Sequence, residues 1–249
     1  MSKNKSRLIV ALDIDSIKEL RILLEYLEDY VDIFKVGSQL FTSCGPAAVR
    51  FIEARGKKVF LDLKYHDIPN TVASSVSAAV QLSVALERSM DFENRITPKA
   101  QGLFMYTVHT SGGLEMMQKA QEAGTAKAKE LSLPKPLVVG VTVLTSEQTK
   151  ENTQAVVLER ALLAKKAGLD GIVASPHEAK MIRKEFGNDF IIVTPGIRPL
   201  GAGLQDQKRV ATPKEAILSG SNFLVVGRPI IKAENPGKAA QEILKEMDF

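Results

Sequence analysis

Short apolar runs alternate with longer amphipathic stretches along most of the chain. Strand-like apolar runs occupy residues 8–13, 33–37, 59–64, 103–109, 137–143, 171–175, 190–195 and 223–227. Between them, helical periodicity predicts helices, for example over 17–30, 47–55, 114–130, 155–167 and 236–247. Strands that alternate with helices are typical of βαβ units and a parallel sheet. Eight such units in 249 residues favour a closed (β/α)8 TIM barrel over an open doubly wound sheet, so we expect one barrel domain over residues 1–249.

The connection between the third and fourth predicted strands is unusually long. It contains the sequence VALERSMDFENRITPKAQ at residues 84–101. Its polar run and Pro98 predict an extended helix followed by an exposed excursion. We expect this extension to lie on the helix side of the barrel, away from the open end of the strands.

Charged residues interrupt the strand face that should point into the barrel. Alternation gives each of the first three strands one uniformly apolar face, which should pack under the helices. Burying an isolated ion is costly, so charges on the opposite face should pair with one another. A lone charge here could equally be a solvated strand end, but four at equivalent positions favour an active site, which barrels place at this end. The charges concerned are Asp13, Lys35, Asp62 and Lys64.

Composition narrows the classes of function. Hydrophobic residues make up 45% and charged residues 25%, as in a folded globular protein. The net charge of +4 is dispersed without a basic cluster, which argues against a nucleic-acid or membrane surface. The only cysteine, Cys44, excludes an intramolecular disulfide, and we interpret it as a half-buried apolar residue. The apolar stretch 8–12 is too short for an export signal, so we expect a reducing cytoplasm.

The histidines do not predict a metal site. His66, His109 and His177 are widely separated in the chain, and none forms a His-x-x-x-His pair. We interpret His109 as a hydrogen-bonded strand-end residue and His177 as a helix-start residue. The Gly-x-Gly at residues 201–203 lacks the third glycine of a dinucleotide fingerprint. We therefore expect no metal and no organic cofactor.

Arginines follow the seventh and eighth predicted strands, where barrels commonly bind phosphate. A lone arginine is normally a surface salt-bridge residue. Here each arginine follows a glycine-containing turn, in which backbone N–H groups can approach an anion while the guanidinium offers a bidentate fork. These turns predict a phosphate site, formed by Pro195, Gly196 and Arg198 after one strand and by Gly227 and Arg228 after the other.

The segment FLDLKYHDIPNTV, residues 60–72, closely resembles the signature of the orotidine 5′-phosphate decarboxylases. The motifs LIVALD, FKVG, VHTSGG, VTVLTS, TPGIRP, DQKRVATP and VVGRPI occur in that family's order over nearly the whole chain. The resemblance implies that the chain converts orotidine 5′-phosphate (OMP) to UMP and CO2 in de novo pyrimidine biosynthesis, with no cofactor.

The resemblance also implies roles for the charged residues. Lys64 would donate a proton to C6 of the pyrimidine, with Asp62 and Asp67 on either side of it. Lys35 would complete the alternating charge network. A fixed ammonium at Lys64 would stabilise the developing carbanion electrostatically. The sequence leaves open how much the aspartates also repel the substrate carboxylate.

The remaining matched residues would bind the substrate or the partner subunit. In the family, the second aspartate and two residues after it reach the partner's site, which implies an obligate homodimer in which Asp67, Ile68 and Thr71 serve the neighbouring site. The implied substrate contacts are Asp13 and Lys35 on the ribose hydroxyls, Thr145 and Ser146 on the pyrimidine ring, and Gln207, Arg198 and Arg228 on the phosphate.

Two alternatives stay open. A sugar-phosphate barrel of the hexulose-phosphate synthase or keto-gulonate-phosphate decarboxylase type shares the Asp-x-Lys-x-x-Asp strand end but uses Mg²⁺. The continuation at residues 68–71 and the pair at 145–146 argue against it. The other alternative is a non-catalytic barrel that only binds nucleotides, which the four acidic and basic residues Lys35, Asp62, Lys64 and Asp67 make a poorer fit.

Overall fold

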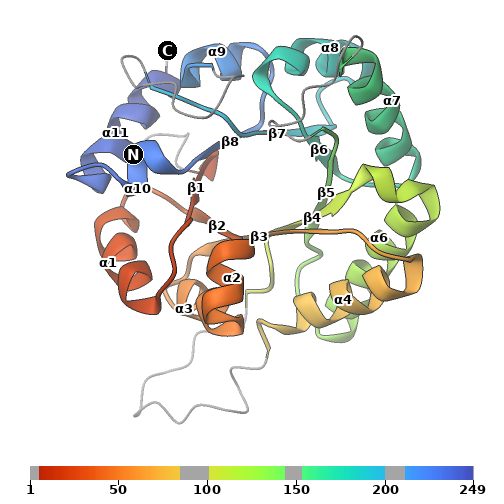
Figure 1. Ribbon diagram of the computed structural model, residues 1–249, viewed down its shortest axis with the longest axis horizontal. Coiled ribbons are helices and arrows are strands. Elements are labelled where there is room, and N and C mark those ends of the chain that lie inside the picture. The colour runs from red at the N-terminus through yellow and green to blue at the C-terminus, as the bar shows by residue number, and fades with distance from the viewer. Residues whose placement is uncertain (1–5, 85–100, 144–152, 200–210, 249) are drawn as a thin grey trace.

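Eight parallel strands close into a barrel in the computed structural model, which describes residues 6–84, 101–143, 153–199 and 211–248 (Figure 1). The strands pair in sequence order, and β8 returns to pair with β1. The predicted (β/α)8 fold is confirmed, although several strands end earlier than the alternation suggested. Their bounds are β1 Leu8–Ala11, β2 Ile33–Gly37, β3 Lys58–Tyr65, β4 Met105–His109, β5 Leu137–Val141, β6 Gly171–Val173, β7 Ile191–Thr194 and β8 Phe223–Val226.

Helices surround the barrel on its outer side (Figure 1). Each of the five predicted helices overlaps an observed one, and the range 236–247 coincides with α11. Several helices start at caps that the sequence encodes, such as the capping boxes of Ser175 with Glu178 and of Thr212 with Glu215. The helices are α1 Ile17–Leu27, α2 Ser38–Cys44, α3 Pro46–Glu53, α4 Pro69–Gln81, α6 Gly113–Glu130, α7 Thr153–Lys166, α8 Pro176–Phe186, α9 Pro213–Leu218, α10 Arg228–Ile231 and α11 Pro236–Met247, with a 3-10 turn η2 at Thr110–Gly112.

The barrel wall separates two apolar layers. Leu8, Val10 and Leu12 belong to the layer between the strands and the helices, against which Cys44 is partly buried as expected. The opposite strand face fills the interior of the barrel. Because the lower interior is apolar, the charged residues of the same face stand above it, at the open end. The interior cluster consists of Ile9, Ala11, Ile33, Phe60, Met105, Val139, Val193 and Val225.

The predicted extension at 84–101 falls almost wholly outside the described residues. The helix that precedes it, α4, ends at Gln81, and the description resumes at Gln101, ahead of β4. The exposed excursion therefore stays a prediction. Within the described ranges, no helix combines the length and apolar character needed to cross a membrane.

Candidate active site

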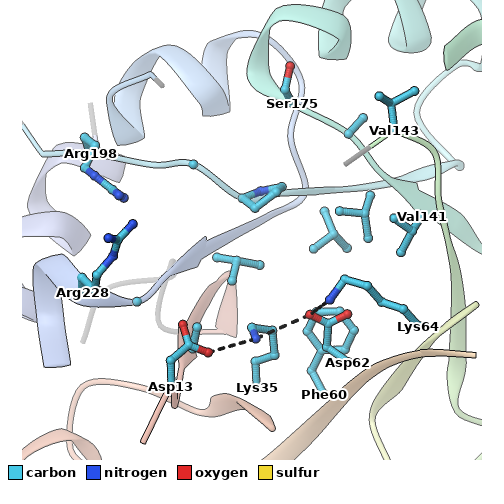
Figure 2. Close-up of a pocket in the computed structure, with 18 residues that line it drawn as sticks. Asp13, Lys35, Phe60, Asp62, Lys64, Val141, Val143, Ser175, Arg198 and Arg228 are labelled. Atoms are coloured by element: carbon cyan, nitrogen blue, oxygen red, sulfur yellow. Dashed lines mark hydrogen bonds and ion pairs between the residues drawn. The ribbon is translucent and has the colours of Figure 1, made fainter. Parts of the chain in front are cut away.

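A pocket opens at the carboxyl ends of the strands, where barrels carry their active sites (Figure 2). Strands β2 and β3 and the residues just after β1 supply its acidic side chains and lysines, and the turns after β7 and β8 supply its arginines. Most of the predicted site residues meet here. Those that line the pocket are Asp13, Lys35, Asp62, Lys64, Pro195, Gly196, Arg198, Gly227 and Arg228.

Asp13, Lys35, Asp62 and Lys64 form a row of alternating charges along one wall of the pocket (Figure 2). The Nζ atom of Lys35 lies 3.5 Å from Asp13 Oδ1 and 3.5 Å from Asp62 Oδ2. The Nζ atom of Lys64 lies 2.8 Å from the same Asp62 Oδ2. Asp62 is therefore held between two ammonium groups, and the expected pairing of two acids with two bases is observed.

The position of Lys35 differs slightly from the prediction. It is the third of the five residues of β2, not the last, and its long side chain carries the ammonium up to the row. Gly37 makes this possible, because a Cβ atom at that position would lie only 2.9 Å from Lys35 Nζ. Asp13, conversely, lies two residues beyond the end of β1 and is half exposed.

Asp62 stays ionised in spite of its burial. Desolvation alone would raise the pKa of this carboxyl, and it is the largest single influence. The charges of Lys35 and Lys64, together with hydrogen bonds from Lys64 and Thr107, outweigh it and hold the pKa of Asp62 below its usual value. A fixed negative charge therefore stands beside the Lys64 ammonium at neutral pH.

Lys64 has an unusual backbone conformation. Its φ of 52° lies in the left-handed region, which residues other than glycine rarely adopt. The pairing of β3 with β4 is irregular between Leu61 and Tyr65, so the ladder bulges at this point. Leu63 and Tyr65 pack against the outer apolar layer while Lys64 points into the pocket. Backbone strain of this kind is typical of functional sites.

The two predicted arginines approach the pocket from β7 and β8, away from Lys64 (Figure 2). Arg198 is 7% exposed, and its Nη1 donates to the Ile197 carbonyl over 2.9 Å. Arg228 begins α10 directly after Gly227. Gly196, with a φ of 78°, makes the turn that brings Arg198 to the pocket. One end of the pocket thus suits a dianionic group, and the other end holds the charge row.

Asp67, Ile68 and Thr71 do not line the pocket of their own chain. They lie exposed where β3 leads into α4, and Ile68 is 66% exposed. The backbone N–H of Ile68 donates to Asp67 Oδ1 over 2.6 Å. This segment therefore presents an acid and a large apolar side chain outward. Thr145, Ser146 and Gln207 lie outside the described residues.

Several residues of the site were missed by the sequence analysis. Val141, Val173 and Val193 form an apolar wall of the pocket, but in the sequence they look like ordinary core residues. Thr107, on β4, donates from its hydroxyl to Asp62 Oδ1 over 3.0 Å. No clear signal marked it in the sequence, because threonine is common in strands.

The described residues hold no group of three or more His, Cys, Asp and Glu side chains placed to bind a metal ion. His177 lies in the first turn of α8, as predicted. His109 ends β4, as predicted, and its ring centroid lies 5.4 Å from that of His66.

Comparisons with known proteins agree with this architecture. Residues 6–243 match the model of the family described as orotidine 5′-phosphate decarboxylase/HUMPS. The chain is 43% identical to the orotidine 5′-phosphate decarboxylase of Geotalea daltonii, over 98% of this chain and 96% of that protein. It is 45% identical to that of Syntrophotalea carbinolica, over 98% and 95%. A crystal structure of the Lactobacillus acidophilus enzyme superposes with a TM-score of 0.78 at 34% identity, covering 98% of this chain and all of that one.

Proposed function

The chain belongs to the orotidine 5′-phosphate decarboxylase/HUMPS family, and we propose that it converts OMP to UMP and CO2 with its own side chains alone. The observation that carries this proposal is the alternating charge row that ends at Lys64, in a pocket that has two arginines elsewhere on its rim. The reaction serves the synthesis of UMP. The relatives at 43% and 45% identity bear the decarboxylase name, which favours this activity over the HUMPS branch of the family.

The pocket supports one orientation of the substrate. We assign the phosphate dianion to Arg198 and Arg228, because both line the pocket and a guanidinium can make bidentate contacts with an anion. The pyrimidine then lies beside Lys64, and the ribose hydroxyls bond to Asp13 and Lys35 between the two ends. Thr145, Ser146 and Gln207 are assigned to the ring and the phosphate on the family pattern.

Lys64 is assigned the chemical step. When the bond from C6 to the carboxylate carbon breaks, CO2 leaves and the electron pair stays on C6. The Lys64 ammonium, fixed by Asp62 at 2.8 Å, stabilises this pair and then transfers a proton to C6, which gives UMP. Water returns a proton to the amine. Because the ammonium is already oriented, little reorganisation is needed when the charge develops.

The proposal and the Mg²⁺-dependent alternative differ in whether activity requires a metal ion. If the lysine–aspartate row stabilises the carbanion, OMP turnover is expected to be unchanged in excess EDTA. The measurement is the decrease in OMP absorbance with and without the chelator, on enzyme dialysed against it. A loss of activity that added Mg²⁺ restores would favour the sugar-phosphate type of chemistry.

We further propose that two chains share each site. Among the residues that the structure describes, a single chain brings one carboxylate, that of Asp62, against the Lys64 ammonium. The exposed Asp67, Ile68 and Thr71 segment has the composition of a contact that completes a neighbouring site. In a symmetric dimer each chain gives and receives the same residues. The partner subunit's Asp67 would then stand on the open side of Lys64.

Mixing two inactive variants tests this sharing. Lys64→Ala and Asp67→Ala each remove one half of the shared site, so each alone is expected to be nearly inactive. In a randomly reassorted equal mixture, about a quarter of all sites combine an intact Lys64 with an intact partner Asp67. Activity should therefore return to about that fraction of the wild-type value. A mixture as inactive as its components would contradict the shared site.

The single cysteine and the intracellular character of nucleotide substrates lead us to propose a cytoplasmic location. We also treat the whole chain, residues 1–249, as one barrel domain, with the 84–101 connection as an insertion in it.

A further inference from the structure

The backbone of Lys64 adopts a conformation that costs energy. Its left-handed φ of 52° is unfavourable for a residue with a Cβ atom, and it lies where the pairing of β3 with β4 is irregular. Such a conformation persists only when surrounding contacts determine it. The contact that meets the Lys64 backbone here comes from the side chain of Thr107.

Thr107 is completely buried in the middle of β4. It follows Met105 on the inward strand face, so its side chain stands directly above the apolar interior of the barrel. Its Oγ1 accepts a hydrogen bond from the Lys64 backbone N–H over 2.8 Å. The same hydroxyl donates to Asp62 Oδ1 over 3.0 Å. One hydroxyl thus bonds both partners of the shortest ion pair in the charge row.

The direction of these two bonds is fixed by chemistry. A backbone N–H can only donate, and an ionised carboxylate can only accept. The Thr107 hydroxyl must therefore accept from Lys64 and give its one proton to Asp62. With the contact of 2.8 Å from Lys64 Nζ to Asp62 Oδ2, the three residues close a ring of hydrogen bonds. The backbone and the ammonium of Lys64 are both tied to the same carboxylate.

We infer that Thr107 is a positioning residue for the decarboxylation: its hydroxyl holds the Lys64 backbone in the left-handed conformation and orients the Asp62 carboxylate toward the Lys64 ammonium. This inference rests on the proposed function, since it assigns Thr107 a role through Lys64. Thr107 does not line the pocket and touches no substrate in this account.

The variant Thr107→Val separates the effect of the hydroxyl from the effect of packing. Thr107→Val keeps the branched shape but leaves a buried N–H and a carboxylate oxygen without this partner. Even a small displacement of a reacting group lowers the rate strongly, so we expect kcat for OMP to fall by about 10- to 100-fold. KM and the Kd for UMP should change little, because the ribose and phosphate contacts remain. Thr107→Ser, which restores the hydroxyl, should recover most of kcat.

The pH dependence of kcat distinguishes the loss of the hydrogen bond from a loss of packing, because packing alone should not shift it. The bond from Thr107 helps to hold the pKa of Asp62 below its usual value. Without it the pKa rises, so Asp62 becomes protonated at a higher pH as the solution is acidified. The acid limb of kcat should therefore shift to higher pH in Thr107→Val and return in Thr107→Ser.

Thr194→Val provides a matched control. Thr194 is also completely buried in a barrel strand, but its hydroxyl bonds to Ser221 Oγ over 2.6 Å. It follows Ile192 on the face toward the helices, away from the charge row. This variant should lose thermal stability while keeping the wild-type kcat and pH profile.

The outcomes are distinguishable. Wild-type kcat and an unmoved acid limb in Thr107→Val, or equal defects in the serine and valine variants, would overturn the inference. Absence of OMP turnover in the wild-type chain would instead overturn the proposed function. If Thr107→Val does not fold, Thr107→Cys gives the same comparison, because a thiol is a poor donor and acceptor of similar size.

Discussion

Replacing Lys64 with alanine is expected to abolish OMP turnover, with a loss of more than about 10⁴-fold in kcat. Two effects disappear together: the fixed ammonium that stabilises the electron pair on C6, and the proton that quenches it. Each is worth orders of magnitude by itself, about 10²–10³ for a preorganised electrostatic donor and about 10²–10⁴ for a general acid. The decrease in OMP absorbance under single-turnover conditions measures the residual rate.

Binding of the product distinguishes a lost chemical step from a lost fold. The proposed phosphate and ribose contacts lie elsewhere in the pocket, so Lys64→Ala should still bind UMP in a calorimetric titration. Lys58→Ala is a suitable control, because Lys58 begins the same strand and its ammonium lies over the Phe104 ring, 5.1 Å from the centroid. It should keep full activity. Near-normal turnover by Lys64→Ala would refute the assignment, because another group would then carry out the chemical step.

The second large effect concerns the phosphate end of the pocket. Substituting Arg228 with alanine removes a charge-assisted contact worth about 1.5–3 kcal/mol, so kcat/KM for OMP should fall by about 10- to 100-fold. Remote binding energy can lower the chemical barrier, which makes kcat as well as KM sensitive to this contact. Orotidine, the nucleoside without phosphate, should be a far poorer substrate of the wild-type enzyme.

Combining the variant with the nucleoside isolates the contact. If Arg228 acts through the phosphate, Arg228→Ala should cost nothing further when orotidine is the substrate, because the group it binds is already missing. Steady-state kinetics of both enzymes with both substrates give the coupling. An equal penalty for OMP and orotidine would show that Arg228 supports the fold or the pyrimidine site. Equal kcat/KM of the wild-type enzyme for OMP and orotidine would show that the proposed phosphate contacts contribute nothing to catalysis.

The charge row could be predicted from sequence because burial makes charges conspicuous. Lys35 and Asp62 share their strand faces with Ile33 and Phe60, which fill the barrel interior. A buried acid and a buried base in such positions are tolerated only when they pair. The in–out alternation alone therefore predicted that they lie side by side. Fold class followed from the same periodicity, since eight strand–helix units leave few other topologies.

The backbone at Lys64 could not be predicted in this way. A positive φ is readable in a sequence when a glycine or asparagine marks it, and lysine gives no such signal. The role of Thr107 was hidden for a related reason, because threonine is favoured in strands and its hydroxyl needs no special partner there. Asp67 shows a third limit, because the role proposed for it lies in a neighbouring subunit, whereas its contact within its own chain is only with the Ile68 backbone N–H.

Several strands were predicted to end too late, because the in–out alternation of side chains continues beyond the hydrogen-bonded ladder. Leu12 and Asp13 continue the in–out pattern of β1, and the Leu12 N–H still donates to the Lys35 carbonyl over 3.1 Å, yet β1 ends at Ala11. At the barrel mouth the chain begins to diverge into the loops while its side chains keep their faces. Asp13 therefore lies just beyond the regular strand, whereas Lys35, Asp62 and Lys64 lie within β2 and β3.

Exchange of the C6 hydrogen of UMP in D2O shows whether Lys64 handles the proton at C6. A lysine that protonates C6 in one direction must remove that proton in the other, without any CO2 being involved. Proton NMR should show the wild-type and Lys58→Ala enzymes replacing the C6 hydrogen with deuterium, whereas Lys64→Ala leaves it in place although UMP is bound. Exchange by Lys64→Ala at the wild-type rate would rule out this role of Lys64, because another group would then be handling the proton.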